Sequence, residues 1–376
     1  MTLEQQRQQL VDVMEQRGDW PQRSPWIRQA VTALPRDLFA PERLYDWDGH
    51  AYQPVDRATD PGRWAQLLFA DPDAAAITRV AGGLPMSSLS CQAVVVDMLD
   101  SLLLEPGQLT LELGTGSGWN SALLAQRTGP HAVTSVELDA GLADAARARL
   151  SAVDVQVGDG SQGWASAAPY DRVISTYAVD RIPWAWVEQT VPGGRIVTPW
   201  GRLGHVALTT AGDGRSATGW VQGLAQFMPA RADLAHTRSY SEIRDGQDGD
   251  GARSVERDLA PLNGNQHLRF ALRVAAPGLR ITTAVDQDGV NAWIHDGHRS
   301  WAALSAVGDG RTVAHQGGPR RLGDELEAAW DQWLGLGSPD LYDYGITVTA
   351  DEQYAWAVDP ETGPRWPASA DSPALS

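Results

Sequence analysis

Short apolar runs alternate with helical stretches through the middle of the chain, between residues 89 and 228. Parallel strands joined by helices give this alternation, because each returning helix covers a face of the sheet. The pattern therefore predicts an α/β fold with a doubly wound, Rossmann-like sheet. The expected helices cover residues 90–104, a stretch after Gly118, 141–150 and 183–189, and the expected strands cover 108–113, 132–136, 154–157, 172–175 and 194–197, the last beyond a Pro-Gly-Gly turn. Alternating runs at 206–210 and 219–227 predict an antiparallel end to the sheet.

The flanking segments have a different character. Residues 1–18 have an amphipathic pattern that predicts a helix, with Leu3, Leu10, Val11 and Met14 on one side. We expect short strands at 268–274, 279–285, 290–294 and 300–305, a helix at 324–336 and a closing hairpin of 347–349 and 354–358. The predicted organisation is an N-terminal helical segment that flanks the substrate (1–88), a core (89–230), an exposed linker (231–257), a smaller α+β C-terminal domain (258–366) and a disordered tail (367–376).

Charge and cysteine content exclude several classes of protein. Among 376 residues, 47 are acidic and 30 are basic, which gives a net charge of −17. Nucleic acids and anionic membranes both require clustered positive charge, so neither is expected as the main partner. The single cysteine, Cys91, rules out an internal disulfide and a cysteine-based zinc site, and we expect no bound metal. Neither a signal peptide nor a run of about 18 apolar residues is present, so a cytoplasmic location is expected.

The segment with the clearest chemistry is a glycine-rich turn between a predicted strand and a predicted helix. It contains Glu112 followed by Gly114, Gly116 and Gly118, and such a turn lets the backbone approach a ligand closely. A second acid, Glu137, ends the next strand 23 positions after Gly114. An acid at that position can accept both ribose hydroxyls of a nucleoside, in NAD or in S-adenosylmethionine alike. Asp159, after the third strand, lies at the same edge of the sheet and can accept from an adenine amino group.

With these motifs in order, the chain resembles class I S-adenosylmethionine-dependent methyltransferases of the protein-L-isoaspartate O-methyltransferase type, over about residues 34–230. The other motifs that carry the resemblance are Pro35-Arg36-Asp37-Leu38-Phe39-Ala40-Pro41, Phe69-Ala70-Asp71, Ser87-Ser88-Leu89-Ser90, Tyr170-Asp171-Arg172-Val173-Ile174, Pro192-Gly193-Gly194, Thr198-Pro199-Trp200-Gly201 and Phe227-Met228-Pro229. The chain departs from the family pattern at Gln92, where proline is usual, and at Phe69, where tyrosine is usual.

The resemblance implies S-adenosyl-L-methionine as the cofactor and S-adenosyl-L-homocysteine as its product. It assigns the methionine part to Glu112 and the loop, the ribose to Glu137, the adenine to Asp159 and Gly160, and the neighbourhood of the substrate carboxylate to Ser90 and Ser88. The implied cofactor-binding residues are Glu112, Gly114, Thr115, Gly116, Ser117, Gly118, Trp119, Glu137, Leu138, Asp159 and Gly160.

A narrower resemblance concerns the substrate. The run 170–194, the Gly118-Trp119-Asn120 end of the loop and the long C-terminal extension are similar to methyltransferases that are paired with ATP-grasp ligases in graspetide biosynthesis. This resemblance implies methylation of an Asp side chain in a macrocyclised ribosomal precursor peptide, followed by closure to an aspartimide. We hypothesise that the helical N-terminus and the C-terminal domain then flank the substrate entrance and choose which peptide enters. One alternative is housekeeping repair of isoaspartyl residues, and another is a non-catalytic protein that binds the cofactor and escorts a peptide.

Several residues have a second interpretation. Ser90 is either a substrate contact, a helix N-cap, or both, while Cys91 is expected to be a small buried residue and not a nucleophile. The Asp-rich stretch 243–251 is expected to be a solvated loop, because it lacks the closing Glu of a calcium loop. The net charge of −17 poses a problem for an acidic substrate unless arginines line its groove. Arg36, Arg79 and Arg181 are the candidates, and the sequence does not rank them.

Overall fold

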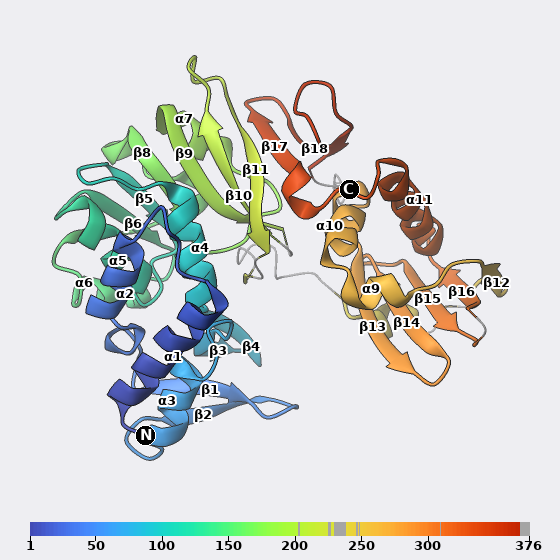
Figure 1. The fold of residues 1–376 in the computed structure, drawn as a ribbon, viewed down its shortest axis with the longest axis horizontal. Helices are drawn as coiled ribbons and strands as arrows, with labels where there is room; N and C mark the ends of the chain where they lie inside the picture. The colour runs from blue at the N-terminus through green and yellow to red at the C-terminus, as the bar shows by residue number, and fades with distance from the viewer. Residues whose placement is uncertain are drawn as a thin grey trace. The chain divides into compact units, whose positions relative to one another are not determined.

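The chain divides into two compact units. The computed structural model describes residues 1–201, 204–224, 227, 228, 238–245, 247, 249–308 and 310–368. The first unit contains Met1–Met228 with Val348–Ala350, and the second contains Pro229–Thr347 with Asp351–Ser376 (Figure 1).

The first unit is built on a twisted sheet whose strand order is β11-β10-β9-β8-β5-β6-β7. Strands β5 to β9 pair in parallel, and β10 pairs antiparallel with both β9 and β11. The chain winds outward through β5, β6 and β7 and then returns to place β8 on the other side of β5. Ligands bind at such a switch point, outside the carboxyl ends of the strands. The strands are β5 (Thr110–Leu113), β6 (Val133–Glu137), β7 (Val153–Val157), β8 (Tyr170–Ser175), β9 (Thr190–Trp200), β10 (Gly204–Thr210) and β11 (Ser216–Leu224).

Most helices of this unit share one apolar core. Residues of α4, α5 and α6 pack with residues of α1, α2 and α3 in a single buried cluster, and α7 contributes none of them. Leu10 and Met14 bring α1 into that cluster, which confirms the amphipathic prediction for the N-terminus. The helices are α1 (Leu3–Arg17), α2 (Trp26–Ala33), α3 (Pro61–Phe69), α4 (Gln92–Leu102), α5 (Trp119–Thr128), α6 (Ala140–Arg147) and α7 (Trp184–Glu188), with short 3-10 turns η1 (Arg36–Leu38), η2 (Gly160–Gln162) and η3 (Ala165–Ala167).

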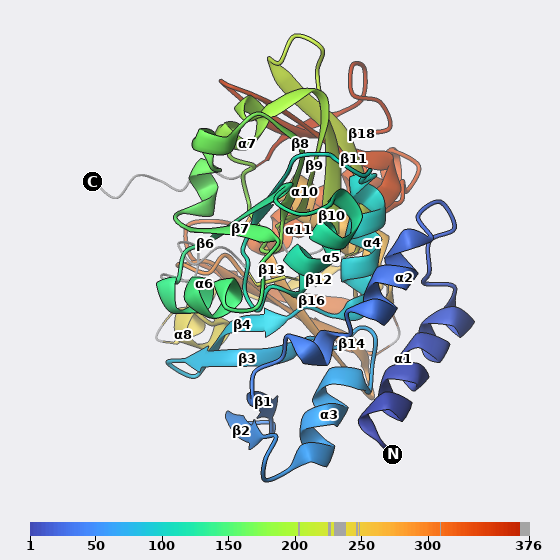
Figure 2. The same cartoon turned by 90° about the vertical axis from the view of Figure 1, so that its left-hand side faces the viewer.

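The prediction of a helical segment at residues 1–88 is only partly right. Besides its helices, this segment forms a four-stranded sheet in the order β2-β1-β3-β4, with α3 against β1 and β2 (Figure 2). The strands have few buried positions, so no apolar alternation marks them in the sequence. They are β1 (Arg43–Trp47), β2 (Tyr52–Asp56), β3 (Ala76–Ala81) and β4 (Leu84–Leu89).

The predicted Pro-Gly-Gly turn is part of a strand. Strand β9 begins at Thr190 and continues through Pro192, Gly193 and Gly194 to Trp200. Gly193 has φ +76°, and the register between β8 and β9 shifts between Tyr170 and Arg172. Because glycine tolerates this irregular backbone, the strand is not interrupted. The Pro-Gly-Gly sequence, which predicts a turn, therefore lies within an irregular strand.

The second unit contains a five-stranded antiparallel sheet in the order β12-β16-β15-β14-β13. Helix α11 contacts β14, β15 and β16, and α9 contacts β13 and β14. Strand β18 also pairs antiparallel with β19. The elements from residue 240 onward, of which β17 ends in residues assigned to the first unit, are α8 (Tyr240–Arg244), β12 (Arg253–Val255), α9 (Ala260–Gly264), α10 (Gln266–Ala275), β13 (Arg280–Asp286), β14 (Gly289–His295), β15 (Trp301–Ala306), β16 (Thr312–Gly317), α11 (Leu322–Gly335), η5 (Leu341–Asp343), β17 (Tyr344–Thr349), β18 (Gln353–Ala357) and β19 (Arg365–Pro367).

Three predictions for this unit are wrong. Residues 268–274 form most of helix α10 and not a strand, because Asn265 caps the helix by accepting from the Leu268 N–H. The expected linker at 231–257 contains α8, whose Ile243 is fully buried, and β12. Apart from the last two residues of α8, the described residues of the stretch 243–251 form a mostly exposed loop, as predicted. Pro367, assigned to the tail, ends strand β19; residues 369–376 of that tail lie outside the described residues.

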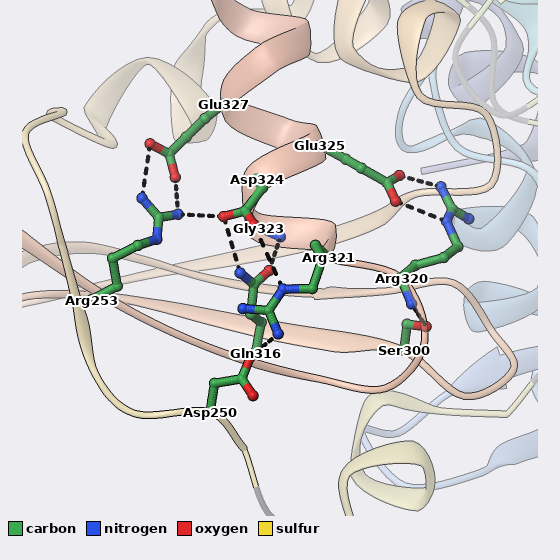
Figure 3. A network of polar contacts seen from close by, with 10 residues as sticks. All are labelled: Asp250, Arg253, Ser300, Gln316, Arg320, Arg321, Gly323, Asp324, Glu325 and Glu327. Carbon is green, nitrogen blue, oxygen red and sulfur yellow. Dashed lines mark hydrogen bonds and ion pairs between the residues drawn. The ribbon is translucent and has the colours of Figure 1, made fainter.

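A network of polar contacts attaches the start of α11 to the sheet of the second unit (Figure 3). Gln316 of β16 accepts from the Gly323 N–H at 2.9 Å and donates to Asp324 at 3.0 Å. Arg253 of β12 donates to Asp324 at 2.9 Å and also pairs with Glu327. The Arg320 guanidinium pairs with Glu325, and the backbone N–H of Arg320 donates to the Ser300 hydroxyl at 3.0 Å. These contacts satisfy the Gly323 N–H of the first helical turn and place Asp324, Glu325 and Glu327 near the positive end of the helix.

Within the described ranges, no helix combines the length and the apolar character needed to cross a membrane.

Candidate functional site

The glycine loop lies at the carboxyl end of β5, at the switch point of the sheet. Gly114, Gly116 and Gly118 all have positive φ, at +96°, +55° and +88°. A Cβ atom on Gly114 would lie 2.5 Å from the Thr176 Oγ1, and one on Gly118 would lie 2.7 Å from a Leu150 methyl carbon. Only glycine therefore fits at both ends of the loop. Helix α5 starts at Trp119, so its first N–H groups face this loop.

Glu137 is at the end of β6 and holds the loop through its carboxylate. Its Oε2 accepts from the Gly116 N–H at 2.9 Å, and its Oε1 accepts from the Asp139 N–H at 3.0 Å. Each oxygen keeps a further lone pair. A carboxylate placed this way fits the ribose hydroxyls of a nucleoside cofactor. The next residue, Leu138, is 53% exposed, as expected of a side chain that is free to cover a ligand.

Glu112 is fully buried below the loop. Its Oε1 accepts from the Asn120 amide at 2.9 Å, and its Oε2 accepts from the hydroxyls of Ser121 and of Ser135, the latter at 2.6 Å. Burial raises the pKa of Glu112 to about 7. Through these bonds the Glu112 carboxylate on β5 contacts both helix α5 and strand β6, so Glu112 stabilises the glycine loop from its buried side. Direct contact between Glu112 and the methionine part of the cofactor stays a prediction.

Two other predicted contacts also point into the protein. Thr115 is buried, and its hydroxyl lies 2.6 Å from the Ser135 hydroxyl. Trp119 is buried as well, and its indole N–H donates to the Leu34 carbonyl at 2.8 Å. These side chains stabilise the loop, which leaves its backbone, with Ser117 half-buried, to face a ligand.

Asp159 follows β7 at the same edge of the sheet and is exposed. It accepts from the N–H and the hydroxyl of Ser161, at 2.9 and 2.8 Å. The neighbouring Gly160 carbonyl accepts from the Trp186 indole at 2.8 Å. The loop that is expected to receive adenine is thereby fixed against α7.

Sequence reasoning missed Tyr177, which lies between the two predicted cofactor loops. A Cβ on Gly114 would lie 3.1 Å from its ring, and a Cβ on Gly160 would lie 2.5 Å from its hydroxyl. Its ring packs edge-on against Trp186 with centroids 6.3 Å apart. Burial, with the nearby charges of Asp159 and Glu137, raises the pKa of Tyr177 well above its usual range. Its position just after β8, at the switch point, is the signal that identifies it.

The serine-rich segment 87–90, which ends strand β4 and leads into α4, brings Ser87 to the glycine loop. The Ser87 hydroxyl is 3.9 Å from the place of a Cβ on Gly116. Side chains alternate along a strand, so Ser88 of β4 faces the opposite side of the sheet. Ser87, Ser88 and Ser90 are half-buried residues, and within the described residues none of their hydroxyls makes a hydrogen bond. Ser87 is a second residue that the sequence pattern does not single out as a site residue.

The second interpretation of Ser90, as the N-cap of the helix that follows it, is wrong. The N-cap of α4 is Cys91, without a side-chain hydrogen bond, so Ser90 does not cap this helix. Cys91 packs against the core, and burial raises its thiol pKa, in agreement with a packing role. Gln92 is buried and donates to the Met14 sulfur at 3.2 Å, while Phe69 is buried in the core. The two departures from the family pattern are therefore packing positions.

Comparisons with known proteins agree with this geometry. The family model described as Protein-L-isoaspartate(D-aspartate) O-methyltransferase (PCMT) matches residues 5–213. The protein-L-isoaspartate O-methyltransferase of Halorhodospira halophila is 34% identical over 215 residues, which cover 55% of this chain and 83% of the relative. The enzyme of the same name from Methylorubrum populi is 39% identical over 154 residues, which cover 39% of this chain and 72% of the relative.

Solved structures support the fold. One named protein-L-isoaspartate O-methyltransferase superposes with a TM-score of 0.52 at 18% identity and covers 94% of this chain and 100% of its own. The prediction of a class I methyltransferase fold with an additional C-terminal region is confirmed. Because the family model spans more than half of the chain and the Halorhodospira relative is covered over most of its length, this protein belongs to the protein-L-isoaspartate O-methyltransferase family of S-adenosylmethionine-dependent enzymes.

Proposed function

We propose that the protein methylates the free α-carboxylate of isoaspartyl residues in peptides and proteins, as the first step of their repair. The observation that carries this proposal is the unbonded hydroxyl of Ser87, which lies next to Gly116 of the glycine loop. Hydroxyl donors at this place suit a carboxylate that must approach the cofactor. The names of the curated relatives favour this substrate over the graspetide precursor, for which no comparison gives support.

The residues present fit S-adenosylmethionine, which supplies a methyl group on a positively charged sulfur. Glu137 would hold the ribose, the backbone at residues 114–118 would hold the methionine part, and Asp159 with Tyr177 would hold the adenine. A carboxylic acid with a pKa of about 4 is ionised at neutral pH, so the acceptor needs no general base. The task of Ser87 and Ser90 is then to orient the acceptor oxygen and to keep water out, which is catalysis by proximity.

The ester determines what happens next. Methoxide, which departs as methanol, is a far better leaving group than the oxide that an ionised carboxylate would have to lose, so the backbone nitrogen of the following residue attacks the esterified carbonyl. The new C–N bond closes a five-membered succinimide and methanol departs. Hydrolysis of that ring returns part of the material as normal aspartyl peptide. The enzyme needs only the methyl transfer, and the later steps follow from the peptide itself.

A pair of peptides that differ only in the aspartyl linkage tests the proposal. Each is incubated with S-adenosylmethionine and followed by mass spectrometry. We expect the isoaspartyl peptide to gain one methyl group and then to form the succinimide, while the normal peptide is unchanged. Ser87→Ala should lower the rate for the isoaspartyl peptide, and Ser88→Ala, on the other side of β4, is the matched control.

Two other outcomes would overturn the proposal. Methylation of a macrocyclised precursor peptide alone would show a peptide-tailoring enzyme, as the narrower resemblance implies, and its product would end one water lighter than it began. Tight binding of S-adenosylhomocysteine without any methylation would show the non-catalytic escort.

A further inference from the structure

We infer that Arg36 is a positioning residue for the methyl-accepting carboxylate: it fixes the turn at residues 89–91 and supplies positive charge behind it. This inference rests on the proposed function of the serine-rich segment 87–90. Of the three candidate arginines, Arg79 is paired with Asp139 and Arg181 is exposed. Arg36 alone among the three is both buried and in contact with the turn.

Three hydrogen bonds to backbone carbonyls hold the Arg36 side chain, which is inaccessible to solvent. Nη1 donates to the Leu68 carbonyl at 2.9 Å, and Nη2 donates to the carbonyls of Leu89 and Ser90 at 3.1 and 2.8 Å. The guanidinium therefore ties the last residue of β4 and the residue after it to helix α3. A backbone held this way fixes where the Ser87 and Ser90 hydroxyls lie.

Arg36 also contacts the start of the helix that follows the cofactor loop. Its guanidinium lies over the Trp119 ring, 5.6 Å from the centroid. Trp119 is the first residue of α5 and follows Gly118 directly. The same indole donates to the Leu34 carbonyl at 2.8 Å, two residues before Arg36. Arg36 thus connects the turn expected to hold the substrate with the loop expected to hold the cofactor.

The charge of Arg36 has no counter-ion in the part of the chain that the structure describes. Among these residues it makes no ion pair with Asp or Glu, and its Nε has no hydrogen-bond partner. Burial lowers its pKa to about 10, so it is protonated at neutral pH. A buried cation without a counter-anion is costly to keep. An anionic substrate bound in front of the turn would relieve that cost, and this explains how a chain of net charge −17 attracts a carboxylate.

The test compares Arg36→Met and Arg36→Lys with the wild type. Steady-state kinetics with the isoaspartyl peptide give kcat and KM, calorimetry gives the Kd of S-adenosylhomocysteine, and circular dichroism verifies folding. We expect KM of Arg36→Met to rise by about tenfold or more with the Kd unchanged within about twofold. Arg36→Lys keeps the charge but not the three carbonyl contacts, so its KM should lie between the two.

Arg127 offers a matched control. It lies over the Trp26 ring at 5.4 Å and donates to the Leu104 carbonyl at 2.9 Å, at the far end of α5 from the loop. Arg127→Met should lower the melting temperature and leave KM unchanged.

The outcomes separate the inference from the proposed function. No methylation of the isoaspartyl peptide by the wild type would refute the proposed function. Methylation by the wild type, with the same KM in folded Arg36→Met, would overturn the inference about Arg36, as would a loss of S-adenosylhomocysteine affinity as large as the rise in KM. If Arg36→Met does not fold, Arg36→Lys decides: a raised KM at constant Kd supports the inference, and an unchanged KM overturns it.

Discussion

The carboxyl group of Glu112 shows how a single buried residue couples the cofactor loop to pH. Its pKa in the folded protein is about 7, against about 4.5 in an unfolded chain, because burial disfavours the charged form. The folded state therefore binds a proton that the unfolded state has lost. The contribution of Glu112 to stability is complete below about pH 4.5 and is lost as the pH rises toward 7.

We predict that Glu112→Gln removes this pH dependence. The pKa difference corresponds to roughly 3 kcal/mol of unfolding free energy between pH 4.5 and 7. Denaturant midpoints of wild type and Glu112→Gln should therefore differ more at pH 8 than at pH 5, in favour of the variant. The exposed Glu188→Gln is the control. Parallel pH profiles for wild type and Glu112→Gln would contradict the prediction.

Tyr177 is the second residue whose role is testable by itself. Its ring lies between Gly114 and Gly160, where an adenine is expected. An aromatic ring stacked on a base contributes about 1–3 kcal/mol, so Tyr177→Ala should weaken S-adenosylhomocysteine binding by roughly 5- to 150-fold in calorimetry. Tyr177→Phe keeps the ring and should bind nearly as well as the wild type. Equal affinity of Tyr177→Ala and wild type would exclude a stacking role.

At the scale of elements, the contact between α4 and β10 contains a buried histidine. His205 of β10 is inaccessible to solvent, and its Nε2 lies 3.4 Å from the Ser101 hydroxyl and 3.7 Å from the Asp97 carboxylate of α4. Burial lowers the pKa of His205 to about 4. The imidazole is neutral in the folded protein, whereas an unfolded chain protonates it below about pH 6.5.

This arrangement predicts loss of stability in mild acid. The contribution of His205 is complete above about pH 6.5 and falls as the pH drops toward 4, by an amount on the order of 3 kcal/mol. Melting temperatures between pH 4.5 and 7 should decline less steeply for His205→Gln than for wild type. His131, whose side chain is 66% exposed, provides the control as His131→Gln. If the melting temperature of His205→Gln declines with pH as steeply as that of the wild type, other titratable groups cause the loss of stability in acid.

At the scale of the whole molecule, the chain forms two compact units; a buried apolar cluster belongs to the first, and the polar network at the start of α11 belongs to the second. Multidomain proteins often unfold in more than one step, and a ligand stabilises the part that binds it. We predict that S-adenosylhomocysteine raises the temperature of one calorimetric transition, that of the first unit, by binding beside Gly116 and Glu137. Arg253→Ala, which removes the contacts to Asp324 and Glu327, should lower the other transition. A single transition that moves with both changes would contradict this view.

The sequence by itself determined the parallel sheet and its ligand edge. Strands buried on both faces leave an apolar signal, and the carboxyl ends of parallel strands meet at one edge of the sheet. The order of strands and acids along the chain is therefore enough to assign Glu112, Glu137 and Asp159 to one region. The glycine spacing was equally informative, because positive φ and close packing allow no other residue at Gly114 or Gly118.

Only the tertiary structure decided which of these side chains lie at the glycine loop and which point into the protein. Ser87 and not Ser88 lies beside Gly116, Glu112 and Trp119 point inward, and Tyr177 spans two loops that are far apart in sequence. The same holds for residues 268–274, where apolar positions fit both a strand and a helix until α10 packs against α11. The pattern of apolar and polar residues along the chain predicts which positions are buried. The direction of each side chain and the residues that it contacts depend on segments that are distant in the sequence.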